Sequence, residues 1–157
     1  MKSLHSYSEP GTLLETEPLR LAKLLSLSVP DDFDEVALAR TVAKGLPPSC
    51  VTALIEVLEI DRSEIIGPVI PRGTLQRLTK SGRPLSREYS ERIYSLGRVI
   101  DAVGRAYHGD SKQVKGFLYR PHQMLGGDTP LHMALSSSAG ADAVLSLLDW
   151  ADAGVSV

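Results

Sequence analysis

The chain has 157 residues, of which 43% are hydrophobic and 23% are charged, a balance typical of a folded globular domain. It contains a single cysteine, Cys50, which excludes an internal disulfide and a multi-cysteine zinc site. No apolar run reaches the length of a membrane span, and the first residues lack the apolar stretch of a secretion signal. We therefore expect a cytoplasmic protein.

Residues 1–30 are predicted to form a flexible N-terminal segment. Serine, glutamate, threonine and proline dominate its first eighteen residues, and such a composition gives little apolar surface to bury. Leu19 to Val29 predicts one short apolar helix, which Pro30 ends.

Two amphipathic helices are predicted next. Asp34 is a candidate N-cap for the first helix, which ends at Gly45 and has apolar positions at Val36, Ala39, Val42 and Ala43. The second helix begins near Ser49 and places four apolar residues on one face: Val51, Leu54, Ile55 and Leu58.

The segment from Ser63 to Lys80 has the spacing of a helix–turn–helix. A short helical turn over 63–66 ends at Gly67-Pro68, and a second helix follows Pro71 and is closed by Ser81-Gly82. Arginine and glutamine reach base edges, whereas threonine and lysine suit phosphates. The residues that we expect to contact DNA are Arg72, Thr74, Gln76, Arg77, Lys80 and Arg83.

Positive charge is concentrated in this part of the chain. Residues 72–105 carry eight basic and three acidic residues, whereas residues 1–70 carry six basic and eleven acidic residues. The formal net charge is only −2 at pH 7, so the bias appears only when the charge is divided by position. It indicates either a nucleic-acid surface or a well-solvated helical face.

The longest predicted helix begins at Ser86. Its apolar residues follow a heptad-like spacing and are Tyr89, Ile93, Leu96, Ile100, Val103 and Tyr107. The pattern fits a central helix buried within the chain or, alternatively, a dimer seam. Gly97 and Gly104 lie beside the seam and allow close approach of another helix.

Short helices and a turn make up the rest of the chain. A helix ends near Phe117, a tight turn follows at Gly126–Asp128, Thr129 caps another helix, and the last helix runs from Ala141 to Trp150. No alternating pattern predicts a strand. The expected fold is all-α, with a helix–turn–helix bundle over residues 31–108 and a small helical C-terminal domain over 109–157.

No constellation of residues predicts an active site, and we expect neither an enzyme nor a cofactor. His122, Asp128 and His132 lack the spacing of a metal motif, so no metal is predicted. Cys50 is more typical of a small buried filler than of a nucleophile. A hydrolase using Cys50 or His132 has no supporting constellation.

The C-terminal motifs resemble a known family. The run Leu125-Gly126-Gly127-Asp128-Thr129-Pro130-Leu131, then Gly140, then a helix ending at Gly154-Val155, resembles the C-terminal toxin-binding domain of the Xre/MbcA/ParS antitoxins. The helix–turn–helix domain that precedes it in this family resembles three further motifs here: Gly45-Leu46-Pro47, residues 74–77 and residues 82–88. The resemblance covers residues 35–157.

The resemblance implies an antitoxin that is not an enzyme. Antitoxins of this family are encoded beside RES-domain toxins, which resemble ADP-ribosyltransferases and destroy cellular NAD. The antitoxin covers the toxin's active-site entrance with its C-terminal domain, and the antitoxin or the complex represses its own promoter. We also expect a homodimer, because helix–turn–helix proteins usually read two half-sites.

A set of C-terminal residues is predicted to bind the toxin: Leu125, Gly126, Gly127, Pro130, Leu131, Gly140, Leu148, Trp150, Asp152, Gly154 and Val155. Tryptophan is a frequent interface anchor, and Asp149, Asp152 and the terminal carboxylate are suited to basic groups that hold the phosphates of NAD. The leading alternative is a stand-alone dimeric helix–turn–helix regulator, whose C-terminal domain only dimerises or senses a ligand.

Overall fold

The computed structural model describes residues 3–154 and confirms the all-α fold. Within this range the only β-type pairing is an isolated bridge between Ile66 and Ile70, and no helix is long and apolar enough to cross a membrane. The elements in chain order are η1 (Leu4–Ser8), α1 (Pro10–Leu14), α2 (Glu17–Leu24), α3 (Glu35–Lys44), α4 (Ser49–Leu58), η2 (Arg62–Glu64), α5 (Arg72–Ser81), α6 (Arg87–Ala106), α7 (Ser111–Tyr119), η3 (Gln123–Leu125), α8 (Pro130–Ser136) and α9 (Ser138–Asp152), where η marks a 3₁₀ turn.

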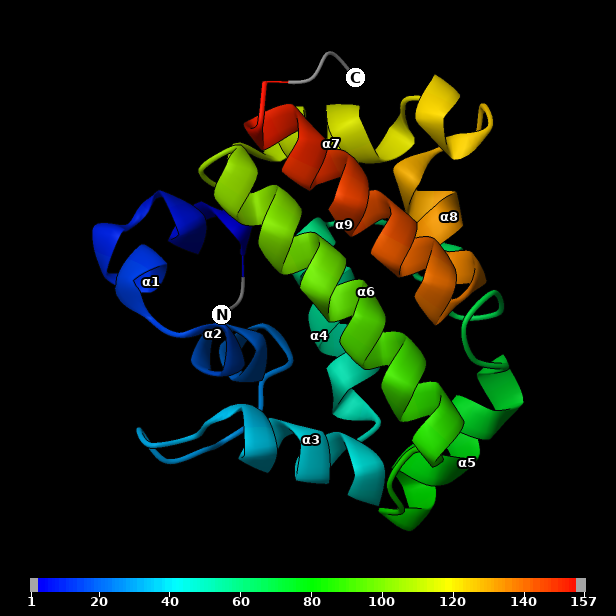
Figure 1. The fold of residues 1–157 in the computed structure, drawn as a ribbon. Coiled ribbons are helices and arrows are strands. Elements are labelled where there is room, and N and C mark those ends of the chain that lie inside the picture. The colour runs from blue at the N-terminus through cyan, green and yellow to red at the C-terminus, as the bar shows by residue number, and fades with distance from the viewer. Residues whose placement is uncertain (1–2, 155–157) are drawn as a thin grey trace.

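Helix α6 lies at the centre of the molecule, with α9 on one side and the N-terminal helices on the other (Figure 1). Ser86 caps it by accepting a hydrogen bond from the backbone N–H of Tyr89. The seam residues Ile93, Leu96, Ile100 and Val103 are at most 1% exposed. The predicted central helix is therefore confirmed. Its apolar seam is covered by the chain itself, so this seam is closed to a second copy.

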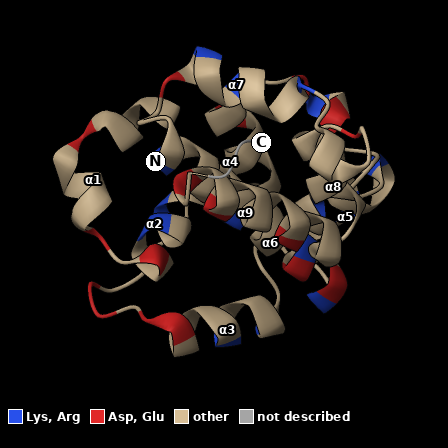
Figure 2. Ribbon diagram, turned by 45° about the horizontal axis from the view of Figure 1, so that its top comes forward, with Lys and Arg blue, Asp and Glu red and all other residues tan. Residues whose placement is uncertain are grey.

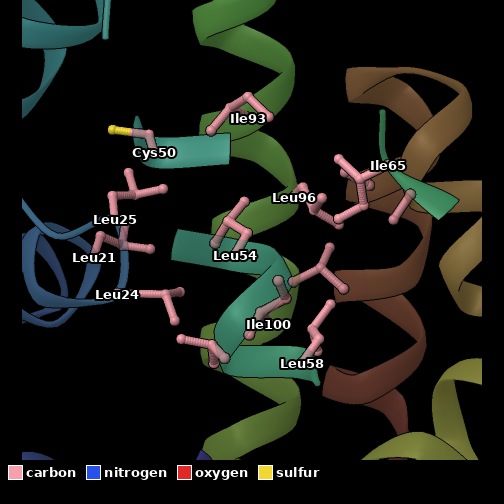
Figure 3. Packing of buried hydrophobic residues seen from close by; sticks show 14 of the residues in the cluster. Leu21, Leu24, Leu25, Cys50, Leu54, Leu58, Ile65, Ile93, Leu96 and Ile100 are labelled. Atoms are coloured by element: carbon pink, nitrogen blue, oxygen red, sulfur yellow. The ribbon is translucent and has the colours of Figure 1, made fainter. Parts of the chain in front are cut away.

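A single hydrophobic core surrounds α6 and extends from Leu4 to Leu148. Figure 3 shows its middle, where Leu54 and Leu58 of α4 meet Ile100 of α6, and where the leucines of α2 approach from one side. All four apolar residues predicted for α4 are buried. The two predicted domains thus share their core.

The N-terminal segment is packed, and the prediction of a flexible segment over residues 1–30 is wrong for its described part, residues 3–30. Leu4, Tyr7 and the leucines at positions 21, 24 and 25 are buried in the core. A Cβ on Gly97 would lie 3.7–3.9 Å from these three leucines, so the expected close approach of a helix is made by α2. Prolines and polar residues interrupt the apolar residues of this segment, so its sequence does not show one continuous helical pattern that would have predicted the packing.

A buried ionic cluster holds this segment against α6. The carboxylate of Asp101 is 1% exposed and accepts hydrogen bonds from Tyr7 Oη at 2.9 Å, Arg20 Nε at 3.0 Å and Arg105 Nε at 3.1 Å. Burial and the neighbouring Asp101 raise the pKa of Tyr7, which keeps the phenol a neutral donor. Removing one buried partner would leave the other charge uncompensated. The cluster therefore favours a single position of the N-terminal segment on α6.

Helix α3 buries only one of its four predicted apolar positions, Val42. Asp34 caps it as expected, with its Oδ1 accepting from Ala37 N at 2.8 Å, but Val36 is 56% exposed. Leu38, which the prediction omitted, is the other buried residue of this helix, and α3 contacts α2 and α6. Ala39 and Ala43, which share the predicted face, are exposed.

Gly104→Ala is expected to destabilise the protein by about 1–3 kcal/mol, as overpacked cores do. A Cβ at this position would lie 2.7 Å from the ring of Tyr7, which is fully buried and has no room to move. Urea unfolding measures the effect. The matched control is Gly116→Ala in α7, where a Cβ meets nothing within 4 Å and the higher helix propensity of alanine stabilises by up to about 1 kcal/mol. Equal unfolding midpoints for Gly104→Ala and wild type would contradict the seating of Tyr7.

Candidate functional site

Helix α5 presents most of the residues predicted to contact DNA. Leu75 faces the core, Thr74 is half-buried, and Gly82 closes the helix in the left-handed conformation with φ of 67°. The side chains on the outward surface are exposed and are those of Arg72, Gln76, Arg77, Lys80 and Arg83. We refer to these five residues as the basic face.

Seven of the eight basic residues of segment 72–105 divide into two groups by their partners, and the eighth, Arg87 at the start of α6, has no partner within residues 3–154. Arg92, Arg98 and Arg105 on α6 are held by backbone carbonyls or carboxylates of the chain. The four cations of the basic face, in contrast, have no side-chain partner within residues 3–154, and segment 72–83 contains no acidic residue. The basic face therefore has its charge available for phosphates.

The element that precedes α5 is shorter than a regular helix. In place of the predicted turn over 63–66, the chain forms the 3₁₀ turn η2, whose N-cap Asp61 accepts from Ser63 N at 2.8 Å. The turn ends at Glu64, before Gly67-Pro68, and Gly67 N in the loop that follows donates to Ile70 O at 2.8 Å. Because Ile65, Val69 and Ile70 are buried, the loop into α5 is anchored in the core.

Helices α8 and α9 pack against each other and form the C-terminal module with α7 and η3. Thr129 caps α8 as predicted, accepting from His132 N at 3.2 Å, and Ser137 caps α9 by accepting from Gly140 N at 2.9 Å. A Cβ on Gly140 would lie 2.0 Å from the carbonyl oxygen of Met133, so this close contact between the two helices requires glycine.

The structure separates the predicted toxin-binding residues by burial. Five of them are buried within the chain, and their role in toxin binding stays a prediction: Leu125, Pro130, Leu131, Gly140 and Leu148. The exposed ones are Gly126, Gly127, Trp150, Asp152 and Gly154, and Val155 lies outside the described residues. Met124 in η3 is a further large apolar residue that is exposed.

The end of α9 combines an aromatic ring with free carboxylates. Trp150 is 46% exposed and lies between Asp149 and Asp152 in the sequence. These two carboxylates have no ion-pair partner in the described part of the chain. We refer to Asp149, Trp150 and Asp152 as the acidic tip.

Charge is separated over the whole chain. Residues 121–157 contain four aspartates and no lysine or arginine, which is the reverse of the basic face. Figure 2 shows a further acidic region along the N-terminal elements, from α1 to the start of α3. A cationic partner surface would therefore be attracted to the C-terminal module and a polyanion to α5.

The two residues considered for hydrolysis differ in environment. Cys50 is fully buried in α4, and burial raises the pKa of its thiol to about 12. A buried, protonated thiol is a poor nucleophile, so the structure agrees with its prediction as a filler. His132 is exposed, and its Nδ1 lies 2.7 Å from Asp128 Oδ2, a hydrogen bond that lowers the pKa of Asp128.

His122 organises the loop between α7 and α8. Its backbone N–H donates to Asp128 O, and its carbonyl accepts from Leu125 N and Gly127 N, each at 3.0 Å. The ring is buried 5.2 Å from that of Phe117, and its Nε2 finds no hydrogen-bond partner within the described chain. Burial, and then the charge of Arg120, lower its pKa, although a hydrogen bond to the backbone of Phe117 opposes the shift.

Within residues 3–154, the all-α chain thus presents an unpaired basic helix and a separate acidic module, two surfaces of opposite charge. Residues 37–98 match the antitoxin Xre-like helix-turn-helix domain, and residues 98–154 match the antitoxin Xre/MbcA/ParS C-terminal toxin-binding domain. The chain therefore belongs to the Xre/MbcA/ParS antitoxin family, as its motifs predicted. The two matches meet at Arg98 within α6, whereas the boundary at residue 109 stays a prediction. A search of curated proteins found no match.

Acid is expected to destabilise the protein through His122. Its pKa in the folded state lies below the ordinary value of 6.5, so the folded state disfavours the proton and stability falls as the pH drops below about 6.5. Urea unfolding between pH 7.5 and 5 measures this dependence. His122→Gln should flatten the curve, whereas His5→Gln, at an exposed histidine, should leave it unchanged. Identical pH dependence in His122→Gln and wild type would contradict the assignment.

Proposed function

We propose that this antitoxin binds and occludes the active-site entrance of a cognate NAD-degrading RES-domain toxin, and that it represses its own operon by binding operator DNA. The observation that carries the proposal is the separation of charge between the basic face of α5 and the acidic C-terminal module. Its action is stoichiometric binding in the cytoplasm, without a cofactor or metal.

The acidic tip supports the toxin half of the proposal. A site that binds NAD needs basic groups for its phosphates, and the carboxylates of Asp149 and Asp152 have no competing partner within residues 3–154. Trp150 adds apolar area at the centre of this charge, as an interface anchor does. Gly126 and Gly127 leave the neighbouring turn without side chains that would hinder a partner.

The basic face supports the operator half. Arg72, Arg77 and Lys80 reach solvent from a helix that Leu75 anchors in the core, as a helix that enters a major groove requires. A single α5 reads one half-site, so a homodimer is part of the proposal. Because the seam of α6 is buried, the dimer contact must use another surface.

Arg77→Ala and Lys80→Ala are each expected to weaken operator binding about tenfold or more, since a lost base or phosphate contact costs about 1–3 kcal/mol. Fluorescence anisotropy with the promoter DNA at several salt concentrations measures the affinity. A phosphate contact should also lower the slope of log K against log salt by about one. The matched control is Arg98→Ala, because Arg98 already pairs with Glu17 and Asp142. Equal losses in the control and the α5 variants would contradict an operator surface on α5.

The toxin half is tested by co-expression with the product of the adjacent gene. Asp149→Asn with Asp152→Asn, and separately Trp150→Ala, are expected to weaken toxin binding about tenfold or more and to restore toxicity. Co-purification, growth and cellular NAD are measured. Asp142→Asn, on the same helix but beside Arg98, is the control and should neutralise as wild type does.

The same experiment separates this proposal from the alternative. Deletion of residues 150–157 should abolish neutralisation, and unchanged neutralisation would exclude the acidic tip. If no partner co-purifies and the adjacent gene is not toxic, but the chain binds its operator tightly alone, a stand-alone dimeric regulator replaces the antitoxin proposal.

A further inference from the structure

The guanidinium of Arg92 joins the two matched modules. Its Nη1 donates to the carbonyl of Val69 at 2.9 Å, and its Nη2 donates to the carbonyls of Pro68 at 3.2 Å and Leu135 at 2.7 Å. Pro68 and Val69 belong to the loop that leads into α5, whereas Leu135 lies in the last turn of α8. In contrast to Arg98 and Arg105, Arg92 has no carboxylate partner within residues 3–154.

The chemistry of this contact favours arginine. The last backbone carbonyls of a helix such as α8 receive no hydrogen bond from an N–H group of the same helix. A cation at a helix C-terminus is also stabilised by the helix dipole. A planar guanidinium can hold acceptors of two separate segments in fixed directions, which the point charge of a lysine cannot do as well. Arg92 thus satisfies the end of α8 and the loop before α5 with one group.

Two more polar contacts cross the same joint. Tyr119 Oη at the end of α7 donates to the carboxylate of Glu64, and Lys115 Nζ donates to the carbonyl of Glu59 at 3.2 Å. All three contacts hold the stretch 59–69, which directly precedes α5, against the C-terminal module. A groove of about 460 Å³ runs along the joint beside Arg92, so the contacts cross a boundary that solvent reaches.

We propose that Arg92 is a positioning residue that couples occupation of the C-terminal module to operator binding by α5. A partner that orders α8 also orders the Leu135 carbonyl, and through Arg92 the loop at 68–69. The loop before α5 is then held by the bound partner as well as by the core, so toxin and operator each tighten the binding of the other. This inference rests on the proposed function for its two ligands.

Hydrogen exchange tests the joint in the full chain without any partner. Thr129→Ala removes the cap of α8 and should speed exchange in α8 and, through Arg92, in residues 70–75. With Arg92→Gln or Arg92→Lys in the background, the effect of Thr129→Ala should stay within α8. Arg98→Gln is the matched control and should leave the transmission intact. Exchange at Ile100 in the core serves to exclude global unfolding.

Two results would overturn the role of Arg92. One is that Thr129→Ala leaves residues 70–75 unchanged in the otherwise wild-type chain. The other is that the effect reaches them equally with and without Arg92. If Arg92 had only a local structural role, replacing it would change exchange nearby, but Thr129→Ala would still affect residues 70–75. Comparing the single and double variants therefore tests coupling specifically.

Operator affinity with and without saturating toxin tests the same coupling with both ligands. The wild type and Arg98→Gln should bind the operator at least fivefold more tightly in the presence of toxin, and Arg92→Gln should show a change below twofold. Equal toxin effects in all three proteins would overturn the proposal. If the wild type binds neither ligand, the proposed function fails, and the exchange experiment still decides whether Arg92 joins the modules.

Discussion

The burial of α6 is the constraint on which the rest of the structure depends. This one helix contacts elements from η1 to α9, and its glycines at positions 97 and 104 leave room for the leucines of α2 and the ring of Tyr7. The two family matches meet on it at Arg98. Both modules pack on α6. A change in the position of one module therefore reaches the other through side chains that contact both, and Arg92 hydrogen-bonds to each of them directly.

The N-terminal segment extends this arrangement beyond the matched family domains, which begin at residue 37. It covers α6 with Tyr7 and α2, and the buried carboxylate of Asp101 binds Tyr7, Arg20 and Arg105 together. A buried charge cluster is costly to desolvate and costly to break, so its main consequence is the choice of one arrangement over others. In this chain the segment is therefore part of the folding unit.

The arginines show how one residue type serves different purposes in this protein. Three of those on α6, Arg92, Arg98 and Arg105, are held by other parts of the chain, whereas those of the basic face have no internal partner within residues 3–154. The acidic tip is the counterpart in the C-terminal module, with Trp150 between two aspartates that have no ion-pair partner among the described residues. The basic face and the acidic tip belong to separate elements that pack on one shared core.

The sequence by itself determined the local structure and the family. Caps at Asp34, Ser86 and Thr129 and the break at Gly45 lie where predicted, because capping and turn formation depend on residues within a few positions of each other. The motif order likewise identified both domains. Only the tertiary structure decided that the N-terminal segment packs, that Leu125, Leu131 and Leu148 are buried, and which arginines are held by other parts of the chain. These properties depend on contacts between distant residues, such as Arg20 and Asp101, which are 81 positions apart and which no local pattern relates.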